Sequence, residues 1–289
     1  MSPWLRFFRL RLAPTAISNV IAGAALGGWR LESTEWLILL GWTLALYMAG
    51  MAFNDVVDRD KDASNAPHRP LPAGEISVAK AHLSLIVLAM PVVLLLIGMP
   101  TSARLYAVAA IVCVFLYNLA FKEVPVLGAV VMGAVRFSIV MVGASFAGHA
   151  MQALPLALDV LFFTAAVTYF SQEEERGRPG VLRLRFLLTC IVAIASYTTF
   201  QLQYPLMQLT ISFLLLCWLL GMASPRPGKP ASYTTFSMLL ALPLLDLRAT
   251  ITYPQTVVPV LVVLAWLSLC PWTIFRSGAA ATTPTRRSG

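Results

Sequence analysis

The sequence predicts an all-α protein, a polytopic bundle of nine to ten transmembrane helices. Of its 289 residues, 58% are hydrophobic. Only 12% are charged, about half the roughly 25% found in an ordinary soluble domain. The charges gather in short segments between apolar stretches of about 15 to 20 residues, the length that a helix needs to cross a bilayer. These observations argue against a water-soluble globular protein.

Apolar runs of this length define ten candidate spans. They cover residues 13–29, 36–53, 81–100, 102–121, 126–148, 153–170, 186–202, 204–222, 232–247 and 255–275. The run at 232–247 is the weakest because it is short and ends at Asp246 and Arg248, so nine spans remain an alternative. We expect residues 1–276 to form a single transmembrane domain and the polar tail at 277–289 to be disordered.

The basic residues are distributed unequally over this arrangement. With ten spans, one side of the membrane receives 17 Lys and Arg residues and the other receives 3. Cytoplasmic segments retain positive charge, so we expect both termini and both acidic segments in the cytoplasm, in a bacterial inner membrane. Topology and attraction to anionic lipids then explain the net charge of +8. Nucleic acid is not expected as a partner, since no groove-reading or zinc-finger motif is present.

The first acidic segment follows the second predicted span. Its oxygen-bearing side chains are Asn54, Asp55, Asp58 and Asp62. If the helix continues here, Asn54, Asp58 and Asp62 share one face, with Asp55 beside them. Stacked carboxylates repel each other, and oxygen ligands of this kind suit a bridging Mg²⁺ ion. The alternative is a solvated helix end that Arg59 and Lys61 neutralise.

This segment resembles the first motif of the UbiA family of membrane prenyltransferases. The four residues match the pattern N-D-x-x-D-x-x-x-D, and residues 69–74, Arg-Pro-Leu-Pro-Ala-Gly, match the R-P-L-x-x-G that follows it. Weaker support comes from Tyr117, Asn118 and Lys122 at the end of the fourth span. The resemblance extends over most of the chain, from the Arg11 region to the last span.

The resemblance implies helices around a central cavity, in which two facing acidic motifs hold Mg²⁺ against the diphosphate of a prenyl diphosphate. Loss of pyrophosphate leaves an allylic cation, which an unidentified lipophilic or small-molecule acceptor attacks. The resemblance assigns Asp58 and Asp62 to catalysis. It assigns the diphosphate to Asn54, Arg69, Lys122, Tyr117 and Asn118, and the Mg²⁺ ions to Asn54, Asp55, Asp58, Asp62, Glu173, Glu174 and Glu175.

The second motif of the family, two aspartates four residues apart after the sixth span, is altered. Glu173, Glu174 and Glu175 stand at this place, and Gly177 lies four residues beyond Glu173. Neighbouring helical residues point about 100° apart, so at most one or two of these glutamates can reach a shared metal. In this feature the chain resembles the UbiA-like proteins of the EboC type. A solvated loop that pairs the glutamates with nearby arginines is the alternative.

The altered motif leaves a second function open. A UbiA-like bundle could act as a transporter or assembly subunit that binds a lipid or pathway intermediate without turning it over. The intact first motif argues against this alternative. A CDP-alcohol phosphotransferase is not expected, because its D-G-x-x-A-R motif is missing near Asp55.

One basic residue, Arg136, lies within a predicted span, about ten residues into the fifth apolar run. A charge near the bilayer midplane costs roughly 2.5 to 3.5 kcal/mol even on the most lenient scale, so this side chain should face the protein interior. Two roles are open. Arg136 could act in catalysis by contacting the diphosphate or a polar acceptor, or it could pair structurally with Asp159 or Asp246.

Overall fold

The computed structural model describes residues 2–28, 35–175, 238–239 and 241–250. These residues are helical and include no strand. The predicted spans at 186–202, 204–222 and 255–275, the first part of the span at 232–247, and the tail at 277–289 lie outside the described residues.

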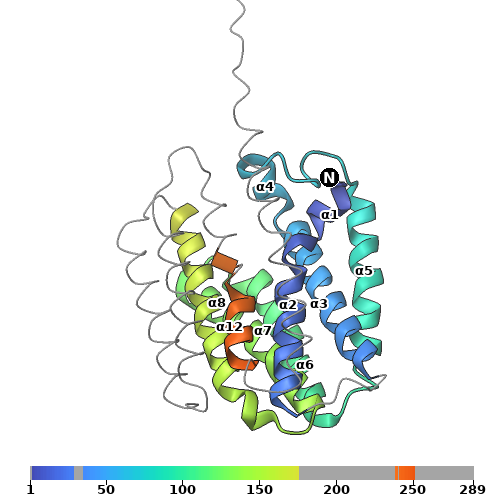
Figure 1. The fold of residues 1–289 in the computed structure, drawn as a ribbon. Coiled ribbons are helices and arrows are strands. Elements are labelled where there is room, and N and C mark those ends of the chain that lie inside the picture. The colour runs from blue at the N-terminus through green and yellow to red at the C-terminus, as the bar shows by residue number, and fades with distance from the viewer. Residues whose placement is uncertain (1, 29–34, 176–237, 240, 251–289) are drawn as a thin grey trace, which may run out of the picture.

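The described helices follow one another with short connections (Figure 1). The N-terminal part contains α1 (Pro3–Phe7), η1 (Leu10–Leu12), α2 (Ala13–Leu26), α3 (Trp36–Val57) and α4 (Arg59–Asn65). The central part contains α5 (Val78–Leu94), α6 (Thr101–Leu116), the π-helical turn η2 (Tyr117–Phe121), α7 (Pro125–Phe146), η3 (Ala150–Ala153) and α8 (Leu154–Glu175). The last described helix is α12 (Leu242–Thr250). Each of the first six predicted spans coincides with a long helix, which confirms the all-α prediction.

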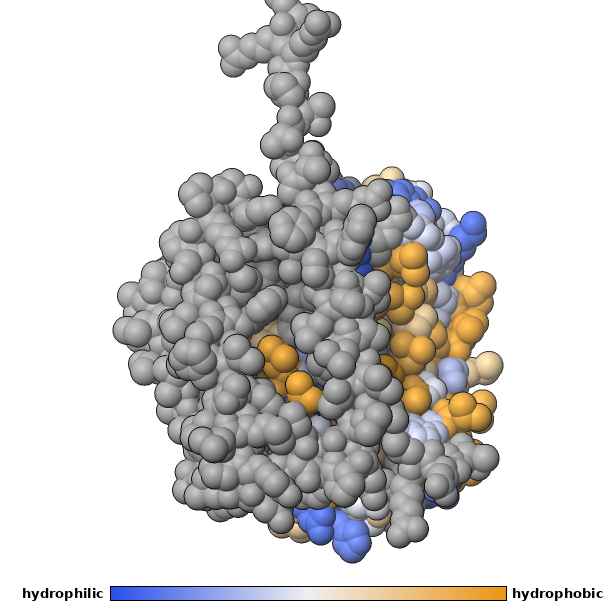
Figure 2. All heavy atoms as spheres, in the orientation of Figure 1, coloured by the Kyte–Doolittle hydropathy of each residue, from blue (hydrophilic) through white to orange (hydrophobic). Residues whose placement is uncertain are grey.

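The helices carry the apolar surface of a membrane protein. The stretches Trp36–Val57, Thr101–Phe121, Pro125–Phe146 and Ala150–Gln172 are long and apolar enough to cross a membrane. Large apolar side chains such as Ile86 on α5 remain exposed. Figure 2 shows a hydrophobic zone on the coloured side of the molecule, with hydrophilic atoms at its upper and lower ends. An apolar surface of this extent is unfavourable in water, so the chain is an integral membrane protein.

The helices α2 and α7 approach each other until their backbones touch. A Cβ atom on Gly23 would lie 2.0 Å from the carbonyl oxygen of Val140, and one on Gly143 would lie 2.2 Å from that of Val20. Only glycine leaves room for this contact, and small residues are the usual means of packing membrane helices closely. These glycines are therefore packing positions.

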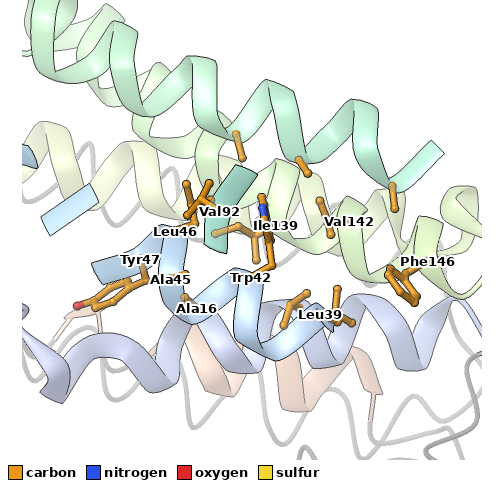
Figure 3. Packing of buried hydrophobic residues seen from close by; sticks show 14 of the residues in the cluster. Ala16, Leu39, Trp42, Ala45, Leu46, Tyr47, Val92, Ile139, Val142 and Phe146 are labelled. Atoms are coloured by element: carbon orange, nitrogen blue, oxygen red, sulfur yellow. The ribbon is translucent and has the colours of Figure 1, made fainter. Parts of the chain in front are cut away.

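Larger side chains fill the space around α3. Trp42 is fully buried in a cluster that includes Ala16 of α2, Val92 of α5 and Ile139 of α7 (Figure 3). A buried indole in a core that draws on three other helices limits rotation of α3. The packing therefore fixes the direction in which the acidic side chains at the end of α3 point.

Candidate active site

The first acidic segment covers the end of α3 and the start of α4, which meet at Asp58. Although α3 ends at Val57, the N–H of Asp58 donates to the Asn54 carbonyl at 2.9 Å and the N–H of Asp62 donates to the Asp58 carbonyl at 2.8 Å. Asp55, Asp58 and Asp62 are buried, with 3%, 8% and 6% of their surfaces exposed. The second span does not continue as one helix through Asp62, but the three aspartates are nevertheless all turned into the protein.

Three basic side chains from distant parts of the sequence neutralise these aspartates. Arg9 donates to Asp55 at 2.7 Å, Arg69 donates to Asp62 at 2.5 Å, and Lys122 bonds to Asp58. Buried carboxylates need such partners, because an isolated charge in a medium of low polarity is strongly unfavourable. The site therefore consists of three aspartates and three cations.

The two basic residues inside the acidic segment have other partners. Arg59 donates to the exposed Asp60 at 2.8 Å, and this hydrogen bond and the charge of Asp60 raise the pKa of Arg59 above its ordinary value. Lys61 donates to Glu123 at 2.6 Å. The burial of the three aspartates and their pairing with cations from other segments argue against the alternative of a solvated helix end.

Lys122 is directed toward the site by the π-helical turn η2. Its backbone N–H donates to the carbonyl of Tyr117, five residues earlier, at 2.9 Å. This wider turn shifts the residues that follow it relative to α6, and π-helical turns recur at functional sites. The ammonium group of Lys122 then bonds to Asp58 and donates to the side-chain oxygen of Asn54 at 2.8 Å.

Arg69 is placed by the loop that follows α4. Leu71 and Ile76 are buried, and they pack with Phe7 of α1 in a small apolar cluster. Gly74 adopts φ +73°, a left-handed conformation that glycine takes at no steric cost. The Arg-Pro-Leu-Pro-Ala-Gly run is thus a folded loop whose apolar residues hold it to the bundle while its arginine reaches Asp62.

The second acidic segment lies at the end of α8, and Lys122 connects it with the first. Gln172, directly before Glu173, donates from its side-chain amide to the backbone carbonyl of Lys122 at 3.2 Å. Gly128 of α7 lies beside this contact, and it permits the close approach of α7 to η2, since a Cβ atom there would lie 2.4 Å from the carbonyl oxygen of Phe121. Lys122 therefore contacts the first motif through its side chain, and its backbone carbonyl contacts Gln172, which directly precedes the second motif.

Two of the predicted diphosphate contacts, Tyr117 and Asn118, are buried in the turn itself. The Asn118 amide donates to the Val114 carbonyl of its own helix at 2.9 Å. The structure thus places Asn118 in a local contact and Lys122 in the acidic site.

Arg136 belongs to a different polar network. It donates to Thr15 at 2.8 Å and to the side-chain oxygen of Asn19 at 3.2 Å, both on α2. The Asn19 amide donates to both carboxylate oxygens of Asp246 at 2.9 Å, and Ser18 donates to the same carboxylate at 2.6 Å. Asn19 thus bridges Arg136 and Asp246 and joins α2, α7 and α12. These contacts support the structural role, and the catalytic role of Arg136 remains a prediction.

A family model described as the UbiA prenyltransferase family matches residues 12–281. The chain belongs to this family. A digeranylgeranylglyceryl phosphate synthase from Methanoculleus marisnigri is 32% identical to this UbiA-family protein over 131 residues, 45% of this chain and 47% of that one. A 4-hydroxybenzoate octaprenyltransferase from Legionella pneumophila is 36% identical over 83 residues, 28% of this chain and 29% of that one. These two matches span about half or less of each relative.

A longer match joins the UbiA-family chain to a protoheme IX farnesyltransferase from Leptospira interrogans, 24% identical over 268 residues, 82% of this chain and 92% of the relative. Among solved structures, a UbiA homologue from Aeropyrum pernix K1 has a TM-score of 0.68 at 17% identity and covers 83% of this chain and 97% of its own. A homologue from Archaeoglobus fulgidus bound to DMAPP and Mg²⁺ has a TM-score of 0.61 at 16% identity, covering 86% and 100%. The predicted family and fold are confirmed.

The donor set of the UbiA-family site suits a hard divalent cation. Its ligands are carboxylate and amide oxygens, which Mg²⁺ prefers. Within the described residues no three acidic, histidine or cysteine side chains converge as a ready metal cluster. Two oxygens, from Asn54 and Asp58, do converge on one positive atom, the ammonium nitrogen of Lys122. Asn54 and Asp58 therefore share the Lys122 ammonium group as their positive partner.

Sequence reasoning missed Arg9 as a member of the UbiA-family site. The residue lies 46 positions before Asp55, in a segment that shows no motif. The sequence indicates only that Arg9 lies among the basic residues before the first predicted span, on the side of the membrane where the acidic segments are expected. Arg11 shares that signal and is exposed, so the signal alone does not select Arg9.

Proposed function

We propose that this protein is a membrane prenyltransferase that moves a prenyl group from a prenyl diphosphate to an acceptor. The observation that carries the proposal is the set of three buried aspartates, each paired with a basic side chain from a different segment. The names of its relatives, which transfer prenyl or related isoprenoid groups, agree with this activity. A metal–diphosphate complex needs carboxylates that bind the metal and positive side chains that bind the phosphate oxygens, and this site provides both.

In the proposed reaction, the bond between the allylic carbon and the diphosphate oxygen breaks, and the electron pair leaves with pyrophosphate. Asn54, Asp55, Asp58 and Asp62 would hold Mg²⁺, and one or two of Glu173, Glu174 and Glu175 would add a second metal contact. When bound, Mg²⁺ neutralises charge on the departing pyrophosphate. Arg69 and Lys122 would hold phosphate oxygens, since their positive groups already lie at the same carboxylates. The acceptor attacks the allylic cation and then loses a proton.

We further propose that the protein lies in a bacterial inner membrane with the acidic site at its cytoplasmic face. The uneven distribution of Lys and Arg supports this orientation. The N-terminus and α4, which carries Asp62, lie at the same end of the described bundle (Figure 1). A cytoplasmic site would meet a water-soluble diphosphate head group while the apolar tail stays in the membrane.

The test measures pyrophosphate release by the purified protein from a prenyl diphosphate and a panel of acceptors, with Mg²⁺ and with a chelator. Asp58→Asn and Asp62→Asn should each lower the rate by about 100-fold or more, because each removes a charge that the reaction needs. Asp60→Asn is the matched control, since the Asp60 side chain is 87% exposed and bonds only to Arg59 among its described contacts. Activity that survives the combined Asp58→Asn and Asp62→Asn changes would exclude the proposal.

The non-catalytic alternative predicts a different result. A transporter or assembly subunit would bind prenyl diphosphate tightly and release no pyrophosphate with any acceptor. The replacement of the second aspartate pair by three glutamates is the feature that favours this function. Lipid analysis of cells with and without the protein would separate the two, because only the enzyme generates a prenylated product.

A further inference from the structure

We propose that Arg9 is an exchangeable counter-ion in the site. Its guanidinium holds Asp55 in the free protein, and it moves to a diphosphate oxygen when a divalent cation takes over that carboxylate. This inference rests on the proposed function, because it concerns the same ligand, a metal-bound diphosphate. It adds the N-terminal segment, residues 3–12, to a site that otherwise comprises the end of α3, α4 with the loop after it, and Lys122 at the end of η2.

The two partners differ in their freedom to move. The Asp55 side chain is 4% exposed, whereas that of Arg9 is 34% exposed. A single nitrogen of the guanidinium, Nη2, donates to Asp55 Oδ1 at 2.7 Å, and Asn54 contributes a longer contact to the same oxygen at 3.3 Å. The carboxylate is therefore fixed on a buried helix, while the cation approaches it from a more open side through a flexible stem.

The backbone at Arg9 is held in an unfavourable conformation. Arg9 has φ 46° and ψ 42°, and no other non-glycine residue in the described ranges has a positive φ. Side chains with a Cβ atom rarely adopt this left-handed region, and such strain persists where neighbouring groups impose it. The carbonyl of Arg9 accepts from the Tyr47 hydroxyl at 2.9 Å and from the N–H of Leu12 at 2.9 Å. These bonds fix the point from which the guanidinium reaches the site.

The N-terminal segment is also anchored to the loop that carries Arg69. Phe7 is fully buried against Leu71 and Ile76, and Arg6 pairs with Glu75 of the same loop. Two of the three cations of the site therefore project from segments that pack on each other. Figure 1 shows α1 and α4 at one end of the bundle, where these segments lie.

The balance of charge gives the exchange an energetic basis. Three aspartates and three cations cancel in the free protein. A metal-bound diphosphate brings both signs, so each carboxylate can turn to the metal and each cation to a phosphate oxygen without leaving a charge unpaired. Removal of Arg9 leaves one negative charge in excess. This excess favours a free divalent cation and disfavours an anionic diphosphate, so the two affinities should change in opposite directions.

The experiment compares Arg9→Gln with Arg11→Gln, a matched control in the same segment whose side chain is exposed. The first arm titrates each purified protein with Mn²⁺ alone and follows the free ion by electron paramagnetic resonance. The second arm measures the KM for a prenyl diphosphate at saturating Mg²⁺. For Arg9→Gln we expect Mn²⁺ to bind about threefold to tenfold more tightly and the KM to rise about tenfold. Arg11→Gln should stay within about twofold of the wild-type protein in both arms.

The outcomes separate the inference from the proposed function. If Arg9→Gln leaves both quantities unchanged, or weakens both together, Arg9 has no exchangeable role and the inference is overturned. Arg9→Lys keeps the charge, so it should restore Mn²⁺ affinity toward the wild-type value, and a thermal melt checks that each variant is folded. If the wild-type protein releases no pyrophosphate, the proposed function fails, while the Mn²⁺ titration still tests whether Arg9 competes for Asp55.

Discussion

Lys122 and Asp58 form a largely buried ion pair, and loss of one partner should destabilise the protein. Loss of one partner of a fully buried ion pair costs about 3–5 kcal/mol. The side chains here are 21% and 10% exposed, so solvent screening reduces the cost of Lys122→Met to about 2–3 kcal/mol. For a chain of this size, that loss corresponds to a fall in melting temperature of about 4–12 °C. Thermal unfolding of the purified protein in detergent measures it.

A double variant shows whether the unpaired charge is the cause. Adding Asp58→Asn to Lys122→Met should recover at least half of the lost stability, because the neutral amide needs no counter-ion. Lys61→Met is the control, since Lys61 and Glu123 are 50% and 70% exposed and their pair should contribute less than about 1 kcal/mol. The reasoning is refuted if Lys122→Met melts within about 2 °C of the wild type, or if the double variant is no more stable than the single one.

Three further predictions concern packing and the polar networks. Gly143→Ala should destabilise the protein by about 1–3 kcal/mol, because its Cβ atom would overlap a carbonyl of α2, whereas Gly41→Ala, whose nearest neighbour is a side-chain atom 3.6 Å away, should be neutral or slightly stabilising in the same melting assay. Asp246→Ala should cost about 2–4 kcal/mol, since it leaves buried donors without their acceptor; an unchanged melting temperature would contradict the network. Gln172→Ala should cost about 1 kcal/mol in unfolding experiments and lower the rate of pyrophosphate release, because it frees the backbone at Lys122; an unchanged rate would argue against coupling between the two motifs.

The membrane spans and the acidic face could be predicted from the sequence because both depend on short, regular spacing. Apolar runs of helical length coincide with the long helices of the described region. The four-residue spacing of Asn54, Asp58 and Asp62 indicates side chains that lie close together, and Asp58 and Asp62 are both buried at the junction of α3 and α4. Arg69 and Lys122 could also be predicted as site residues, because Arg69 begins the Arg-Pro-Leu run and Lys122 follows the fourth predicted span. Each contacts an aspartate of the first motif.

The remaining features depend on contacts between distant residues. Arg9 reaches Asp55 from a strained turn that no periodicity indicates. In the π-helical turn the N–H of Lys122 donates to a carbonyl five residues earlier, that of Tyr117, and no sequence pattern indicates this wider turn. Asn19 connects Arg136 with Asp246 through hydrogen bonds to both. A single asparagine in an apolar run does not indicate that it links two charged side chains.

The pairing of the three aspartates with cations of the same chain has a consequence for biogenesis. If the buried carboxylates of a membrane protein were neutralised only by a metal, the protein would fold only when that metal was bound. Here Arg9, Arg69 and Lys122 provide the neutralising charge as soon as their segments come together. Neutralisation of these carboxylates therefore does not depend on a supply of metal while the chain inserts and folds.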